Sequence, residues 1–129
     1  MNTIWEQYNL EERILNILDV RYSHDPEHHF GRPFLTPYQI AISFREQYQA
    51  DFDAIGMPIG GIGTGQHNSF SQYIARELSR RINDGDISNI EGGFLADDHI
   101  VELIFNDGGE EVRSSSIKNF DLSLFRRTD

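Results

Sequence analysis

The stretch SQYIARELSRR (Ser71–Arg81) determines how the chain is interpreted, because it combines a helical pattern of apolar residues with a cluster of arginines. At about 100° per residue, a helix over residues 69–84 has one apolar side and one polar side. The apolar side consists of Phe70, Ile74, Ala75, Leu78 and Ile82. The polar side consists of Ser69, Gln72, Arg76, Ser79, Arg80 and Asn83. We expect Asn68 or Ser69 to cap this helix and Gly85 to follow its end.

Two further helices are predicted earlier in the chain. The first covers about residues 3–22, where apolar residues recur at helical spacing. It has two candidate starts with the spacing of a capping box, Thr3 followed by Glu6 and Asn9 followed by Glu12. The second covers about residues 37–50, with Thr36 as its cap, Pro37 at its first position and Gln39 as the capping partner.

The chain after Gly85 has the pattern of antiparallel strands. We expect a hairpin over about residues 99–115, turning at Asp107-Gly108, a dipeptide that favours two-residue turns. This register sets Leu103 opposite Val112 and Glu102 opposite Arg113. We prefer it to a turn at Gly108-Gly109, which sets Asp107 against Glu110. A short strand near residues 87–90 is expected to join the edge of the sheet, and the tail FDLSLFRR (residues 120–127) is expected to dock as a further strand.

These elements predict one α+β domain over residues 1–129, with three helices followed by a small antiparallel sheet. This order of elements resembles that of winged helix-turn-helix domains. The resemblance implies a DNA-binding regulator in which residues 69–84 form the helix that contacts DNA and the hairpin forms the wing.

Charge is unevenly distributed along the chain. The formal net charge is −10, which disfavours non-specific attraction to phosphate backbones or to anionic lipids. Residues 84–112 hold nine acidic residues and no Lys or Arg, so the predicted wing cannot contact phosphate. The sequence contains no cysteine, and it shows no secretory leader or apolar run long enough to span a bilayer. We therefore expect a cytoplasmic protein without membrane contact.

On the DNA hypothesis, the polar side of residues 69–84 enters a major groove. Arg76 and Arg80 would donate to guanine, and Gln72 and Asn83 would pair with adenine. Ser69 and the start of the helix would hold a phosphate, supported by Thr64 and His67 in the preceding loop. The plain alternative for these residues is a solvated helix face. Arg81 lies towards the apolar side near the helix end, where we expect it to pair with an acidic residue or to cap carbonyl groups.

The rival function is a protein-interaction module with no nucleic-acid contact. An acidic domain can bind a basic partner or a second copy of itself, with Tyr8, Tyr22 or Phe125 as exposed aromatic contacts. Such a module would suit an accessory factor in defence, toxin neutralisation or phage biology.

Other chemistry receives little support from the sequence. The glycine-rich residues 56–65 lack the lysine of a Walker loop and the spacing of a dinucleotide fingerprint, which favours a close-packed or flexible connection. The segment HDPEHHF (His24–Phe30) has suitable metal ligands, but we expect a polar surface loop anchored by Phe30 and Phe34. No nucleophile or paired carboxylate motif indicates catalysis. We expect no cofactor, no metal and no small-molecule substrate.

Overall fold

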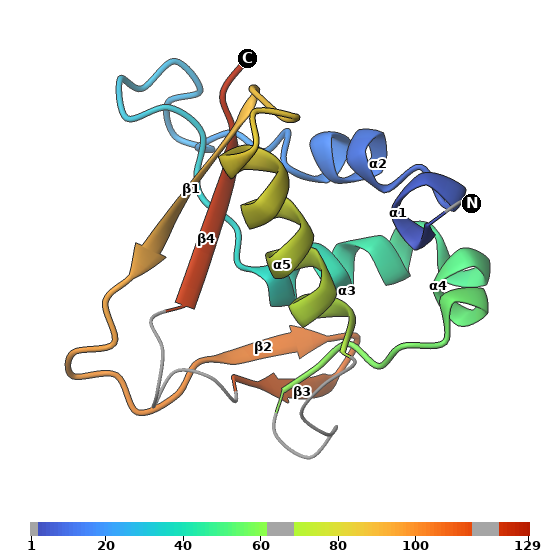
Figure 1. The fold of residues 1–129 in the computed structure, drawn as a ribbon. Coiled ribbons are helices and arrows are strands. Elements are labelled where there is room, and N and C mark those ends of the chain that lie inside the picture. The colour runs from blue at the N-terminus through green and yellow to red at the C-terminus, as the bar shows by residue number, and fades with distance from the viewer. Residues whose placement is uncertain (1–2, 62–68, 115–121) are drawn as a thin grey trace.

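The computed structural model describes residues 3–61, 69–114 and 122–129, and in these ranges the chain is α+β. Five helices and two small antiparallel sheets of two strands each make up the regular structure there. Figure 1 shows the longest helix, α5, alongside the strands β1 and β4, with the β2–β3 hairpin near its N-terminal end. The predicted fold class is confirmed.

The N-terminal helical region is two helices, α1 (Ile4–Gln7) and α2 (Leu10–Ile17), and not one helix over 3–22. Both predicted starts are used. The Thr3 side chain caps α1, whereas Asn9 adopts a left-handed backbone (φ 52°) and breaks the helix. Asparagine tolerates this conformation better than most residues. The second helix ends early because the residues after Leu18, including the exposed Tyr22, have no core to pack against.

The predicted helix over 37–50 is also divided. The capping box of Thr36 and Gln39 is present, and α3 runs over Pro37–Gln47. Tyr48 leaves the helical conformation (φ −134°, ψ 54°), and α4 (Gln49–Ile55) follows in a new direction. The change of direction lets Phe52 of α4 pack edge-on against Phe70, with ring centroids 5.8 Å apart.

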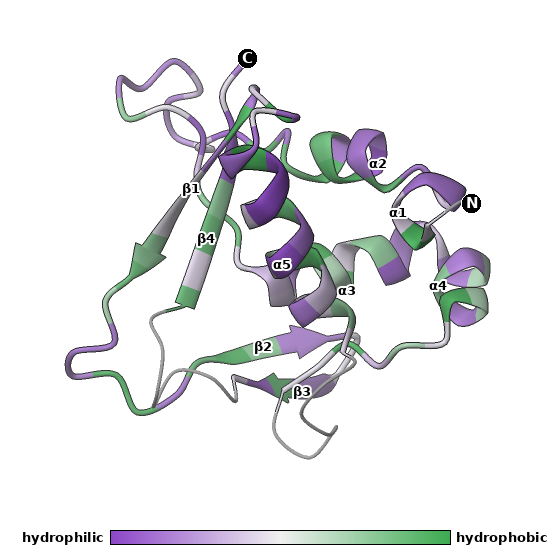
Figure 2. Ribbon diagram, viewed as in Figure 1, coloured by the Kyte–Doolittle hydropathy of each residue, from purple (hydrophilic) through white to green (hydrophobic). Residues whose placement is uncertain are grey.

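The helix α5 (Phe70–Asn83) matches its prediction and forms the centre of the core. Phe70, Ile74 and Leu78 are fully buried, and the ring of Phe70 also contacts that of Phe44 at 5.1 Å. Figure 2 shows purple and green alternating along α5, as expected for a helix that buries one side and exposes the other.

The first sheet pairs β1 (Ile90–Leu95) with β4 (Leu122–Arg127). The sequence placed the first of these strands too early, near residues 87–90, and as an extension of the hairpin sheet. The strand β1 pairs instead with the C-terminal strand β4. The sequence did predict a strand in that tail. Leu35 forms an isolated bridge to Phe125 on the far side of β4, so β4 is covered on both edges at that point.

The second sheet is the hairpin of β2 (Ile104–Asp107) and β3 (Glu110–Arg113), and its register differs from the predicted one. The turn is at Gly108-Gly109, where both residues have positive φ (61° and 99°), a conformation that glycine adopts without strain. Asp107 does face Glu110, but its carboxylate is buried and paired with Arg45 of α3. This ion pair removes the repulsion on which the prediction rested.

Candidate binding groove beside α5

Four residues of α5 share one exposed stripe, because they lie four, seven and eleven positions apart along the helix. They are Gln72, Arg76, Ser79 and Asn83, all exposed. This stripe forms one wall of a groove made of two adjoining hollows of about 400 and 380 Å³. Three of the seven predicted site residues, Gln72, Arg76 and Asn83, therefore lie together in one concave surface.

The opposite wall of the groove comes from the β1–β4 sheet. Phe94 of β1 and Ser123 of β4 line both hollows, and Gly92 and Gly93 line the second. The Phe94 side chain is 73% exposed, which is unusual for so large an apolar residue. The sequence prediction missed this wall, because the strand pairing that builds it joins residues about 30 positions apart.

The outer edge of β1 has unpaired backbone groups. Phe125 exchanges both of its backbone hydrogen bonds with Leu35 (2.8 and 2.9 Å), so its N–H and C=O point away from β1. Gly92 lies opposite Phe125, and bonded and non-bonded pairs alternate along an antiparallel ladder. The N–H and C=O of Gly92 and of Phe94 therefore point to the outer edge. Among the described residues, nothing pairs with them there.

The three arginines of α5 differ in their partners. Arg80 donates to Glu77 over 2.7 Å, and this hydrogen bond raises the pKa of Arg80. Arg81 also contacts Glu77 (3.2 Å) and lies over the Trp5 ring at 4.6 Å, which confirms the expected acidic partner. Arg76 contacts the Tyr73 ring at 5.8 Å and has no carboxylate partner in the described part of the chain. Within the described ranges, Arg76 is thus the one cation of the predicted DNA-contacting face that has no acidic partner.

The start of α5 is not open to a phosphate. The N–H groups of Phe70 and Ser71 donate to the carbonyls of Pro58 and Ile59, at 2.7 and 3.0 Å. The next N–H, of Gln72, donates to the hydroxyl of Ser69, which is buried. Intramolecular acceptors therefore occupy the N–H groups on which the predicted phosphate contact by Ser69 and the helix start depends. Thr64 and His67, the other predicted contacts, lie outside the described residues.

Gly60 and Gly61 allow the preceding loop to approach α5 and the hairpin closely. A Cβ atom on Gly60 would lie 2.3 Å from the hydroxyl oxygen of Ser71, and one on Gly61 would lie 2.4 Å from the carbonyl oxygen of Arg113. Both residues also have positive φ. These two glycines serve close packing, as the sequence favoured.

The loop between α2 and α3 differs from its prediction. Phe30 is 72% exposed and Phe34 is 37% exposed, so they do not anchor the loop in the core. Their rings contact His28 and Arg126, respectively. Across residues 3–61, 69–114 and 122–129, no group of three or more His, Asp or Glu side chains converges as metal ligands would.

The aromatic residues suggested as protein contacts also differ in position. Tyr22 is 45% exposed, as required of a contact residue, whereas Phe125 is buried in the core.

The phenol of Tyr73, whose ring contacts Arg76, has a raised pKa. Burial is the main cause, and the nearby Glu77 carboxylate raises this pKa further.

No protein family, no curated protein and no solved structure matches this chain. The winged-helix resemblance therefore stays a prediction. Of the helices within the described ranges, none combines the length and apolar character needed to cross a bilayer.

Proposed function

We propose that this protein is a non-catalytic binding module that holds an extended segment of a protein partner in the groove beside α5. The observation that supports this most directly is the outer edge of β1 at Gly92 and Phe94, which line the groove and whose outward backbone groups have no pairing partner among residues 3–61, 69–114 and 122–129. An extended segment adds to such an edge through backbone hydrogen bonds, and its side chains enter neighbouring pockets.

The groove offers different contacts to alternate side chains of the bound segment. Phe94 provides an exposed aromatic surface for an apolar side chain. Across the groove, Gln72, Ser79 and Asn83 provide hydrogen-bond donors and acceptors, and Arg76 provides a charge without a carboxylate partner among the described residues. These contacts together favour a segment with an apolar residue at its centre.

The charge around the groove favours a partner with basic residues at the ends of the bound segment. In the sequence, exposed acidic residues precede and follow β1: Asp84 and Asp86 come before the strand and Asp98 comes after it. The net charge of −10 strengthens long-range attraction to a basic partner and opposes pairing with a second copy of the chain.

A displayed library of random twelve-residue peptides, selected on the wild-type protein, tests this proposal. We expect peptides with an apolar residue between basic residues, and we expect Phe94→Ala to weaken their binding at least tenfold by fluorescence anisotropy. Gly92→Pro should do the same, because it removes a backbone N–H that points to the outer edge and leaves the β1–β4 hydrogen bonds in place.

Phe30→Ala is the matched control, since Phe30 is 72% exposed but lies outside the groove, and it should leave peptide binding unchanged. Failure to select any specific peptide, or equal binding by wild type, Phe94→Ala and Gly92→Pro, would reject the proposal.

DNA contact through α5 is the second candidate function. Arg76 supports it, because its guanidinium is exposed and lies in one stripe with Gln72 and Asn83. Two features favour the protein partner: Arg80 and Arg81 share the Glu77 carboxylate, and the β2–β3 hairpin carries three acids and one arginine. Retention on DNA resin at moderate salt that disappears in an Arg76→Ala, Arg80→Ala double variant would support DNA contact.

A further inference from the structure

A second concave surface lies away from α5, between the loop at residues 21–34 and the end of β4. It consists of two adjoining hollows of about 560 and 410 Å³, which share His28, Phe30, Gly31, Arg32 and Arg126. Small-molecule sites in proteins commonly measure about 300–1,000 Å³. The surface is therefore large enough for a compact ligand.

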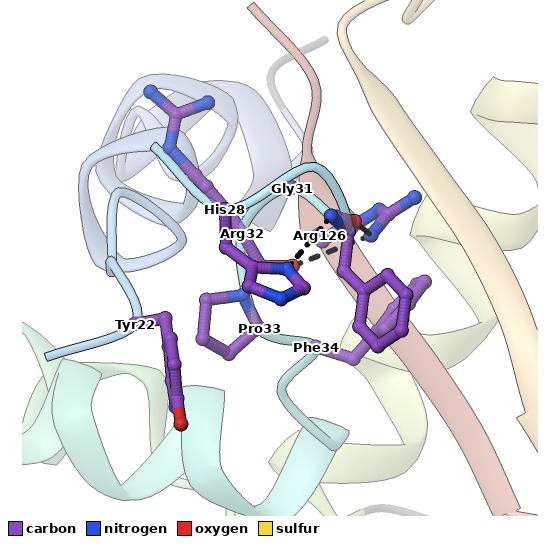
Figure 3. A pocket seen from close by; sticks show the side chains of 8 residues that line it. Tyr22, His28, Gly31, Arg32, Pro33, Phe34 and Arg126 are labelled. Atoms are coloured by element: carbon purple, nitrogen blue, oxygen red, sulfur yellow. Dashed lines mark hydrogen bonds between the residues drawn. The ribbon is translucent and has the colours of Figure 1, made fainter. Parts of the chain in front are cut away.

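The first hollow has aromatic walls. Tyr22, Phe30 and Phe34 line it together with Pro33, and their aromatic side chains are 45%, 72% and 37% exposed. In the view of Figure 3, Pro33 lies between Tyr22 and Phe34. Exposed rings around a hollow stack well on a planar aromatic group. A flat ring is the ligand shape that these walls favour.

Arg126 lines both hollows, and its contacts hold its side chain in place. Its guanidinium lies 4.5 Å from the centre of the Phe34 ring, pairs with Glu91 and donates to the carbonyls of Phe30 and Arg32. Because a cation already occupies the face of Phe34, the hollow disfavours a cationic ligand.

The second hollow gathers cations in an otherwise acidic chain. Arg21, Arg32, Arg126 and Arg127 line it, against the carboxylates of Glu27 and Glu91. Arg32 and Arg127 have partners outside this lining, at 3.2 Å from Asp19 and 2.6 Å from Asp129. Arg21 is exposed and has no ion-pair partner in the part of the chain that the structure describes. It is the cation best placed to receive an anion.

Two further donors face the same hollow. Thr128, an exposed residue, lines it, and His28 lines both hollows. The Nδ1 atom of His28 accepts from the backbone N–H of Phe30 at 3.1 Å, so the proton of its neutral ring is on Nε2, where it can donate. The aromatic hollow is thus continuous with a donor-rich one.

We propose that this surface binds a small planar aromatic anion, with the ring in the hollow of Tyr22, Phe30 and Phe34 and the anionic group near Arg21 and Thr128. This site is independent of the groove beside α5, with which it shares no lining residue. The ligand is bound and not transformed, since no reaction is implied by these groups.

Isothermal titration calorimetry of the full chain with a panel of probes tests the site. The panel contains the four ribonucleoside 5′-monophosphates, phenyl phosphate and 2-naphthoate. Adenosine, which has the ring without the anion, and inorganic phosphate, which has the anion without the ring, serve as half-ligands. We expect at least one aromatic anion to bind with a dissociation constant below 1 mM, and the half-ligands to bind at least tenfold more weakly.

Single variants assign the binding to these residues. Phe30→Ala and Arg21→Ala, both at exposed positions, should each weaken the best probe at least fivefold, whereas Phe94→Ala, at a position 73% exposed, should not. Absence of binding by every probe at 5 mM overturns the proposal. Equal binding by inorganic phosphate, or by the Phe30→Ala protein, overturns it as well. Phe30→Ala tests this site and is the control for the groove, whereas Phe94→Ala tests the groove and is the control for this site. Either proposal can therefore fail while the other stands.

Discussion

The ion pair between Arg45 and Asp107 shows how one contact can decide the register of a strand. The Asp107 carboxylate is only 5% exposed, and the Arg45 side chain of α3 is 28% exposed. Taking a carboxylate out of water is costly unless a cation and hydrogen bonds compensate it. A slip of the hairpin by one position would move Asp107 to the other face and leave Arg45 without its partner.

We predict that Arg45→Met lowers the free energy of unfolding by about 3 kcal/mol, because it leaves the Asp107 carboxylate buried and uncompensated. Urea denaturation followed by circular dichroism measures the loss. The double variant Arg45→Met, Asp107→Leu should recover most of it, since neither charge then remains. A loss below about 0.5 kcal/mol in the single variant would mean that the pair behaves as a solvent-exposed one.

The helices show which signals act locally and which do not. Caps are local, so the starts at Thr36 and Ser69 could be predicted from a few neighbouring residues. The start at Asn9 was likewise a candidate from its own neighbours. The break at Tyr48 could not be predicted, because helical periodicity continues through it and only tertiary packing makes the new direction favourable. The pairing of β1 with β4 depends on contacts between distant segments, which explains why only the α5 wall of the groove was predicted.

We predict that Thr36→Ala destabilises the protein by about 1 kcal/mol, because it removes the acceptor for the Gln39 N–H at the start of α3. Thr36→Ser keeps the hydroxyl and should retain most of the stability. Thermal denaturation of the two variants under identical conditions makes the comparison. Equal losses in both would assign the effect to the methyl group of this buried residue and not to the cap.

At the scale of the whole molecule, one core joins the helices to the β1–β4 sheet. The buried cluster includes Leu10 of α2, Phe44 of α3, Phe70 of α5, Ile90 of β1 and Phe125 of β4. Elements that bury their apolar sides against one another are expected to unfold together in a domain of this size. The two proposed sites lie on the surface of this core and use residues that it does not need, such as Phe30 and Phe94.

Phe70→Ala should therefore cost about 3–5 kcal/mol, through lost burial and the cavity left between Phe44 and Phe52. Phe94→Ala removes the same side chain from an exposed position and should change stability by no more than about 0.5 kcal/mol. Urea unfolding followed both by circular dichroism and by the fluorescence of Trp5 should give coincident transitions in each protein. Separate transitions in the Phe70→Ala protein would show that the N-terminal helices, which hold Trp5, are stable without the rest of the core. Coincident transitions would instead place the groove beside α5 and the aromatic hollow on one cooperative unit, so that a ligand at either site stabilises the entire fold.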